Sequence, residues 1–284
     1  MLGVIVIEFG KVSEFFVSER TPEGFYLSHT DSGEEVFLAH KMNSEDLELN
    51  QNIKAFVYLD TSGDRIATTK IPCAVVGEYA LMTAVEVQEF GAFFDWGIDK
   101  DLLVPGNQQK FSVKEDESYL VRVCLEAETN RVYGTTKLGK YIEDSEFDIE
   151  EGGKVKITPV TATDLGYKVI INKKFIGIIY ANEIFSNISI GATYDGVVKK
   201  IRVDGLVDAA LQVQGIKNLV EAKDKIVSYL ESCEGHSPLN DKSSPTLIKQ
   251  NLGMSKQTFK NALGMLYKER KIKLSKDGIE LITA

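Results

Sequence analysis

An internal repeat is the feature that most constrains the fold of this chain. A short apolar segment and a longer segment that follows it occur first at residues 36–39 and 58–70. They recur at residues 102–105 and 124–137, an offset of 66 residues that becomes 67 near the end. A more degenerate third copy lies at residues 178–181 and 194–205. Because a fixed period indicates one structural unit used several times, the sequence predicts three units of about 70 residues.

Each unit is predicted to be a small β-barrel. Up to about residue 215 the apolar residues alternate with polar ones or form short β-branched and aromatic runs between Gly, Asn and Asp, which is typical of strands. Each unit has room for about five short strands, as in a Greek-key barrel of the OB type, and closure removes the unpaired edges of an open sheet. We therefore expect a mainly β, multidomain chain with OB-folds at residues 1–70, 71–147 and 148–217, followed by a fourth domain at residues 218–284.

The fourth domain is predicted to be an α/β winged helix. Ser244 is suited to cap a helix that begins at Pro245, and Gly253 ends it. Ser255 starts another helix after a short turn, which is the spacing of a helix-turn-helix. Residues 272–281 then form a β-hairpin. A preceding amphipathic helix has an apolar face made of Leu219, Ala222, Ile226, Leu230 and Cys233.

Two motifs in the second unit carry a resemblance to known families. Residues 87–97 resemble the aromatic-Gly-x-aromatic hairpin of S1-type RNA-binding OB-folds. Residues 96–105 resemble the second module of the conserved virulence factor B family of bacteria, whose S1-like modules and winged helix are similar to nearly the whole chain. The resemblance implies RNA binding and a post-transcriptional role in virulence or stress gene expression. Typical S1 modules carry a His after the central apolar strand, where this chain has Ala39, Pro105 and Ala181.

The negative charge of the chain is concentrated in its first half. Of the formal net charge of −9, residues 1–70 carry −6 and residues 71–147 carry −7, whereas residues 148–215 are neutral and residues 216–284 carry +4. Phosphate binding depends on Lys and Arg side chains that displace counterions. Nucleic-acid contacts are therefore predicted mainly in the second half.

The predicted RNA-binding residues accordingly lie in the third barrel and the winged helix, where basic groups could follow a backbone and aromatic faces could stack on bases. The third barrel contributes Tyr167, Lys168, Lys173, Lys174, Lys199, Lys200 and Arg202. The winged helix contributes Lys256, Lys260, Lys268 and Lys271, with Lys273 and Lys276 on its hairpin. Secondary stacking candidates, set among acidic residues that repel phosphate, are Phe90, Phe93 and Trp96.

Two other functions stay open. The winged helix could read duplex DNA as a sequence-specific transcription regulator, with Gln257 and Asn261 as the candidate base readers. Alternatively, the acidic barrels could form a scaffold that binds ribosomal or polymerase subunits. The expected ligand under the leading hypothesis is single-stranded RNA.

An enzyme is not expected. His29, His40 and His236 are scattered, and the sequence has no metal-ligand spacing, nucleophile elbow or Walker glycine loop. We therefore expect no metal and no other cofactor. The cysteines are odd in number and far apart, which favours ordinary thiols. Since no apolar run approaches the roughly 20 residues that span a bilayer, a cytoplasmic protein without a membrane partner is predicted.

Overall fold

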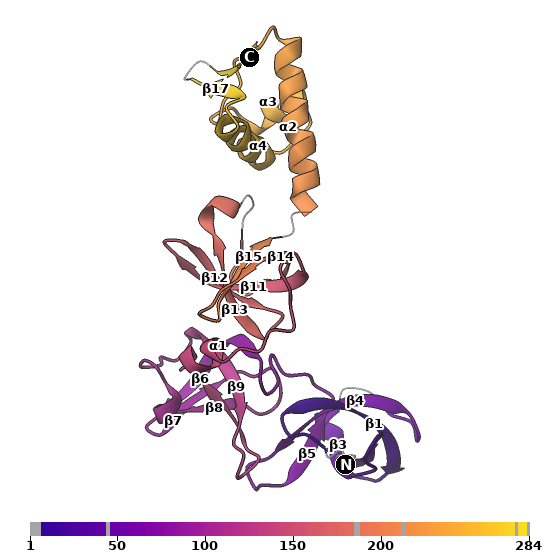
Figure 1. Ribbon diagram of the computed structural model, residues 1–284. Coiled ribbons are helices and arrows are strands. Elements are labelled where there is room, and N and C mark those ends of the chain that lie inside the picture. Colours follow the sequence, from indigo (N-terminus) through magenta and orange to yellow (C-terminus); the bar gives the residue numbers. More distant parts are fainter. Residues whose placement is uncertain (1–6, 44–45, 185–187, 212–213, 276–277, 283–284) are drawn as a thin grey trace.

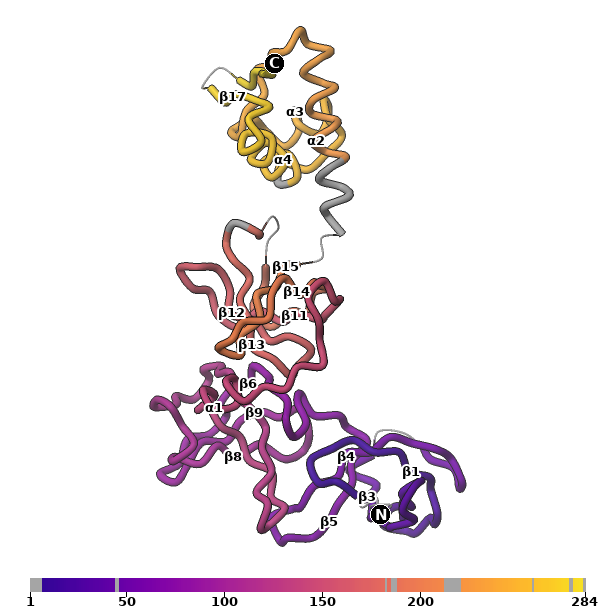
Figure 2. The backbone as a smooth tube through the Cα atoms, viewed as in Figure 1, coloured from indigo at the N-terminus to yellow at the C-terminus, as the bar shows by residue number. Residues whose placement is uncertain are grey.

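The computed structural model describes residues 7–43, 46–184, 188–211, 214–275 and 278–282. It consists of three five-stranded β-barrels and a C-terminal winged helix; the first barrel lies beside the second, and the third lies between the second and the winged helix (Figure 1). Figure 2 shows that the chain passes through these domains in sequence order, so the first barrel and the winged helix lie at opposite ends. The predicted fold class is therefore confirmed.

The first barrel is closed by backbone hydrogen bonds in the order β1-β2-β3-β5-β4, with β4 returning to β1. Alternate side chains such as Phe15, Val17 and Leu27 point inward and are fully buried, as expected for a half-buried strand. Its elements are β1 (Lys11–Arg20), β2 (Gly24–His29), β3 (Glu35–Ala39), the 3₁₀ turn η1 (His40–Met42), β4 (Asn52–Leu59) and β5 (Arg65–Thr68).

The second barrel has the strand order β10-β9-β6-β7-β8. Its first and last strands, β10 and β8, approach through side chains: a Cβ at Gly134 would lie 2.7 Å from a methyl group of Val104. Glycine at this position therefore lets the sheet curl into a nearly closed barrel. Its elements are β6 (Tyr79–Gln88), β7 (Gly91–Phe94), β8 (Leu102–Pro105), η2 (Gly106–Gln108), β9 (Ser118–Leu125) and β10 (Val132–Thr135).

The first two barrels share a packed interface. Residues 55–58 of β4 are buried without interruption, because Ala55 and Val57 face the first core while Phe56 and Tyr58 enter the second. Trp96 lies in that second core, 1% exposed, with its ring edge-on to Phe56 and its Nε1 donating to a backbone carbonyl at 2.8 Å. The expectation that Trp96 stacks on a base was therefore wrong, because its ring fills the space where the barrels meet.

The third barrel is closed in the order β11-β12-β13-β15-β14 and packs against the second through the short helix α1 (Gly139–Glu143). The Arg122 guanidinium lies 4.7 Å from the ring centroids of both Tyr79 and Tyr141. The interface core consists of Tyr79, Leu138, Val160, Ile170 and Ile176, flanked by Ile142 and Leu206. The elements are β11 (Lys154–Thr163), β12 (Gly166–Ile171), β13 (Phe175–Tyr180), η3 (Ala181–Glu183), β14 (Tyr194–Ile201) and β15 (Val207–Leu211).

The C-terminal domain has the predicted winged-helix elements. Ser244 caps α3 by accepting from the Leu247 amide, Gly253 ends it in the left-handed conformation, and Ser255 caps α4. The expected boundary between residues 217 and 218 falls inside α2, which begins at Gln214. The elements are α2 (Gln214–Ser232), β16 (His236–Ser237), α3 (Pro245–Leu252), α4 (Lys256–Lys268), β17 (Ile272–Leu274) and β18 (Ile279–Leu281). Among the described residues, no helix is both long and apolar enough to cross a membrane.

Candidate nucleic-acid interface

One hairpin register recurs in all three barrels and places the candidate site. Gly24, Gly91 and Gly166 begin the second strand of their barrels. A Cβ at these glycines would lie 2.2, 2.7 and 2.0 Å, respectively, from a carbonyl oxygen of the facing strand. Only glycine lets the strands approach this closely. Because side chains alternate along a strand, the residue two positions later faces outward at the same place in each barrel.

In the first barrel this outward position carries an aromatic pair that the sequence analysis missed. Tyr26 lies opposite Phe37 on β3, with ring centroids 5.4 Å apart. The Tyr26 side chain is 38% exposed. The internal repeat could have identified Tyr26 as a stacking candidate, because an offset of 67 residues aligns it with Phe93.

In the second barrel the same position lines a cleft of about 500 Å³. Phe93 lies on its wall and contacts Phe90, which is 61% exposed, edge to face at 6.0 Å between centroids. Lys100 and Arg131 line the same cleft. Arg131 is exposed and forms no ion pair with any described acidic side chain. The cleft thus combines an aromatic face with a free cation, and the turn between β4 and β5 of the first barrel forms its far side.

Lys100 is tied to the first barrel across this cleft. Its Nζ donates to the Leu59 carbonyl at 2.6 Å and lies 5.4 Å from the Tyr58 ring centroid. Burial lowers the pKa of Lys100. Burial also raises the pKa of Tyr58 to about 12, helped by nearby carboxylates. Lys100 therefore holds the two barrels together as well as contributing positive charge.

Acidic residues offset part of the positive charge of the cleft. Asp101 lines it, and burial raises the pKa of its carboxyl, with further increases from the negative charges of Asp95 and Glu86. Asp60 of the first barrel and Glu126 line the cleft as well, so carboxylates that repel phosphate lie on both sides of it.

The third barrel differs at the equivalent place. Lys168 and Ile178 form the outward pair, so no aromatic pair is present there. Tyr167 points the other way and packs against the barrel core. Burial lowers the pKa of Lys168, as does the nearby positive charge of Lys110. The structure therefore does not bring Tyr167 and Lys168 together on one surface.

Two further lysines of the third barrel contact protein groups. The Lys173 Nζ donates to the Cys73 carbonyl at 2.6 Å, at the junction with the second barrel. Lys174 forms a short ion pair with Asp148, and that contact raises the pKa of the lysine. Their ammonium groups are thus already partnered.

Strand β14 and the turn after it hold the remaining third-barrel candidates. The Lys199 Nζ lies 3.7 Å from a Glu183 carboxylate oxygen. Arg202 is paired with Asp204 at 2.6 Å, which raises the pKa of the guanidinium. Lys200 is exposed, and no acidic side chain of the described residues pairs with it. Among the predicted RNA-binding residues of this barrel, Lys200 is therefore exposed without an ion pair to a described acidic side chain, and Lys199 is exposed in a single ion pair.

The winged helix presents its basic residues more openly. Lys260 and Lys268 lie on the exposed face of α4, opposite buried Phe259, Ala262 and Leu263. No described acidic side chain forms an ion pair with Lys260 or Lys268. This face is the largest group of unpaired candidates that the structure brings together.

The other basic candidates of this domain border that face. The Lys271 Nζ lies 3.5 Å from Glu269, whose carboxylate also pairs with Lys223. Lys256 donates to the Lys242 carbonyl at 3.5 Å, and Lys273 is exposed on β17. Lys276 and the Gln257 side chain lie outside the described part of the chain. The Asn261 side chain is half-buried and has a partner.

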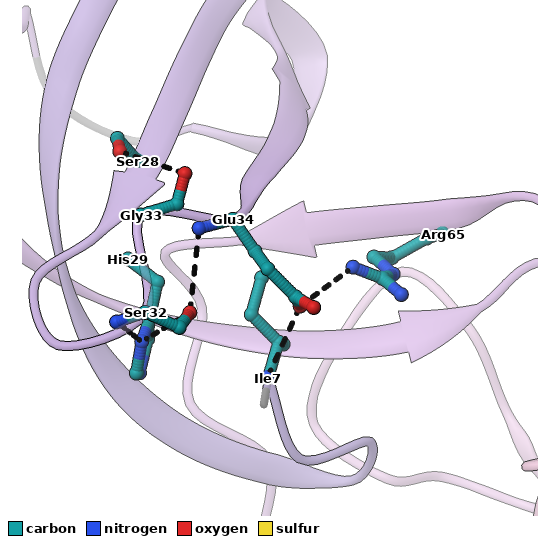
Figure 3. A network of polar contacts seen from close by, with 7 residues as sticks. All are labelled: Ile7, Ser28, His29, Ser32, Gly33, Glu34 and Arg65. Atoms are coloured by element: carbon teal, nitrogen blue, oxygen red, sulfur yellow. Dashed lines mark hydrogen bonds and ion pairs between the residues drawn. The ribbon is translucent and has the colours of Figure 1, made fainter. Parts of the chain in front are cut away.

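A polar network in the first barrel joins a His, a Ser and a Glu (Figure 3). The His29 Nδ1 lies 3.0 Å from the Ser32 hydroxyl, while Glu34 accepts from Arg65 at 3.2 Å and from the Ile7 amide at 3.3 Å. His29 is 5% exposed and packs edge-on against a core ring. These contacts fasten the turn between β2 and β3. Among the described residues, no three His, Cys, Asp or Glu side chains converge to hold a metal.

Comparison with known proteins agrees with this domain order. Residues 9–70 match the S1 domain model, and residues 224–281 match the model of the CvfB-like winged helix domain. The chain thus carries an S1 domain and a CvfB-like winged helix. Their presence confirms the resemblance that the sequence predicted, and both are classes of nucleic-acid-binding domain.

Relatives extend the similarity to nearly the whole chain. YitL of Bacillus subtilis is 28% identical over 90% of this chain and 88% of its own length. Conserved virulence factor B of Staphylococcus epidermidis is 24% identical over 90% of this chain and 89% of its own. A solved structure from Streptococcus pneumoniae, described as a multidomain protein with nucleic acid binding domains, aligns over 96% of this chain and 98% of its own, with 24% identity and a TM-score of 0.42.

Proposed function

We propose that this protein binds single-stranded RNA and regulates gene expression after transcription in the bacterial cytoplasm. The observation that carries the proposal is the cleft of the second barrel, where the Phe93 ring and the Arg131 guanidinium line one space. A ring can stack on an unpaired base while a cation neutralises the adjacent phosphate. The Tyr26 and Phe37 pair offers a second stacking face.

The third barrel and the winged helix supply the phosphate contacts in this proposal. Lys260 and Lys268 on α4 are exposed and unpaired among the described residues. On the third barrel, Lys200 is exposed and Lys199 is engaged only in an exposed ion pair. Since exposed ion pairs contribute little energy, a phosphate can replace Glu183 as the partner of Lys199.

The regulatory role rests on relatives that are named conserved virulence factor B. Single-stranded RNA is favoured over duplex DNA because the aromatic faces on the barrels stack on unpaired bases, which a duplex keeps inside its helix. No cofactor or catalytic step is part of the proposal.

Fluorescence anisotropy on the full chain tests the proposal with a single-stranded RNA and a duplex DNA of the same sequence. We expect tighter binding to RNA and a steep loss of affinity as salt rises. Lys260→Gln with Lys268→Gln should weaken binding and reduce the slope of log affinity against log salt by about 2. Lys199→Gln with Lys200→Gln should act in the same direction. Lys54→Gln with Lys114→Gln, which removes two lysines already paired on the first two barrels, is the matched control.

The alternatives give different results in the same assay. Tighter binding to the duplex would favour a DNA-binding transcription regulator. Absence of binding to either nucleic acid would favour a scaffold for ribosomal or polymerase subunits. An equal loss in the control variant would show that binding follows overall charge, and would overturn the assigned surface.

A further inference from the structure

The third barrel carries an aliphatic surface where the second carries an aromatic one. Leu165 precedes the hairpin glycine, as Phe90 does in the second barrel, and Lys168 takes the place of Phe93. Ile178 completes the surface on β13. Leu165 is 62% exposed, and Phe90, its counterpart in the second barrel, is 61% exposed. At the same register, the third barrel therefore carries aliphatic groups where the second carries planar rings.

These residues line a groove of about 650 Å³ between the hairpin of β12 and β13, helix α1 and the turn after β14. Ile142, Ile176 and Leu206 line it too, and all three also belong to the apolar interface between the second and third barrels. The groove is thus the open continuation of an established apolar interface. A groove of this size is within the range of preformed binding sites.

One wall of the groove is tightly packed. Gly205 has a φ of +80°, and a Cβ there would lie 1.8 Å from the Ile142 carbonyl oxygen. The turn therefore sits directly on α1, without room for a side chain. A partner meets a surface that needs little reorganisation, which reduces the entropy lost on binding.

The rim of the groove is acidic. Glu143 and Asp164 are exposed and form no ion pair with described residues, and Asp204 stands beside them in its pair with Arg202. Lys168 is the one cation that lines the groove within the described part of the chain. Carboxylates around an aliphatic floor repel phosphate and attract the ammonium and guanidinium groups of a protein.

We propose that this groove docks an amphipathic helix of a partner protein, with apolar residues on one face and Lys or Arg on its flanks. A helix is favoured over an added strand because backbone hydrogen bonds close the third barrel, which leaves no free sheet edge for strand addition. The docked helix is a second ligand, and the proposal does not depend on RNA binding elsewhere.

Anisotropy of a fluorescein-labelled amphipathic helix of leucine and lysine, titrated with the full chain, tests the proposal. We expect saturable binding, weakened about tenfold by Leu165→Ser with Ile178→Ser. Asp164→Asn with Glu143→Gln should weaken it severalfold. A helix of leucine and glutamate in the same pattern should not bind. The control for the apolar pair is Leu49→Ser with Ile71→Ser, which are 58% and 52% exposed outside the groove. The control for the acidic pair is Asp31→Asn with Glu128→Gln, which removes two exposed acids outside the groove.

Three outcomes would overturn the proposal. One is equal weakening by the control variants, since the peptide would then follow overall charge. Another is that single-stranded RNA displaces the peptide and that Leu165→Ser with Ile178→Ser also lowers RNA affinity. The groove would then be an RNA site. The third is sedimentation as a dimer that the same variant dissociates, which would make the occupant a second copy. Unchanged RNA affinity in that variant separates this proposal from the proposed function.

Discussion

Lys173 of the third barrel donates a hydrogen bond to the backbone carbonyl of Cys73, 100 residues earlier in the chain, at 2.6 Å. The reverse contact is nearby, because the Tyr79 amide donates to the Lys173 carbonyl at 2.6 Å. Lys173 therefore fastens the second barrel to the third, although its sequence neighbourhood suggests a nucleic-acid contact.

Replacing Lys173 separates these two roles. Lys173→Met should lower the free energy of unfolding by about 1 kcal/mol, because a hydrogen bond to a charged donor is lost. RNA affinity should change little, since the ammonium group is already engaged. Lys200→Met is the matched variant and should do the opposite, weakening RNA binding without loss of stability. Urea denaturation and anisotropy measure the two quantities, and a large loss of affinity in Lys173→Met would contradict this assignment.

The hairpin glycines should tolerate no side chain. Gly24→Ala places a Cβ 2.2 Å from the Leu38 carbonyl oxygen, so we expect a destabilisation of about 1–3 kcal/mol from strand displacement. Gly139→Ala is the control, because nothing lies within 4 Å of a Cβ there. Thermal denaturation of the two variants checks the contrast. Similar melting temperatures for both would mean that the strands can part without cost.

The aromatic pair of the first barrel should contribute to RNA affinity. Tyr26→Ala removes a ring that can stack on a base, and such a loss costs about 1–3 kcal/mol. Tyr26→Phe keeps the ring and should bind RNA almost normally. The comparison is made by anisotropy with single-stranded RNA at fixed salt. Equal affinities of the alanine and phenylalanine variants would remove this face from the interface.

Binding at the second barrel should respond to pH through Asp101. Its raised pKa means that the carboxyl takes up a proton at a higher pH than an ordinary aspartate. As the pH falls towards the range in which ordinary aspartates titrate, Asp101 is protonated before they are, so the cleft loses negative charge and RNA affinity should rise. Asp101→Asn should bind more tightly at neutral pH and show a flatter pH profile. Asp31→Asn serves as the control, and a profile unchanged in Asp101→Asn would contradict the prediction.

Local signals predicted the winged helix in detail. The caps Ser244 and Ser255 and the stop at Gly253 act within a few residues of themselves, so the sequence contains their whole environment. The repeat likewise predicted the barrels, because alternation and turn residues are properties of each strand.

Contacts between barrels could not be predicted in this way. The hairpin motif in the sequence predicts that Trp96 is exposed, whereas in the structure Phe56 from another barrel packs against its ring. The basic residues of the third barrel were likewise counted without their partners: Asp148 and Glu183 lie far from Lys174 and Lys199 in sequence and meet them only in the fold.

If the protein binds single-stranded RNA as proposed, the packing between the first two barrels bears on the length of RNA that it prefers. Phe56 and Tyr58 pack into the second barrel, so the Tyr26 face and the Phe93 face keep a constant separation. An RNA long enough to reach both faces would make the second contact at a high effective concentration. A shorter RNA would contact only one face. Under the proposed function, the packing between these two barrels would therefore set the minimum length of RNA that can contact both aromatic faces.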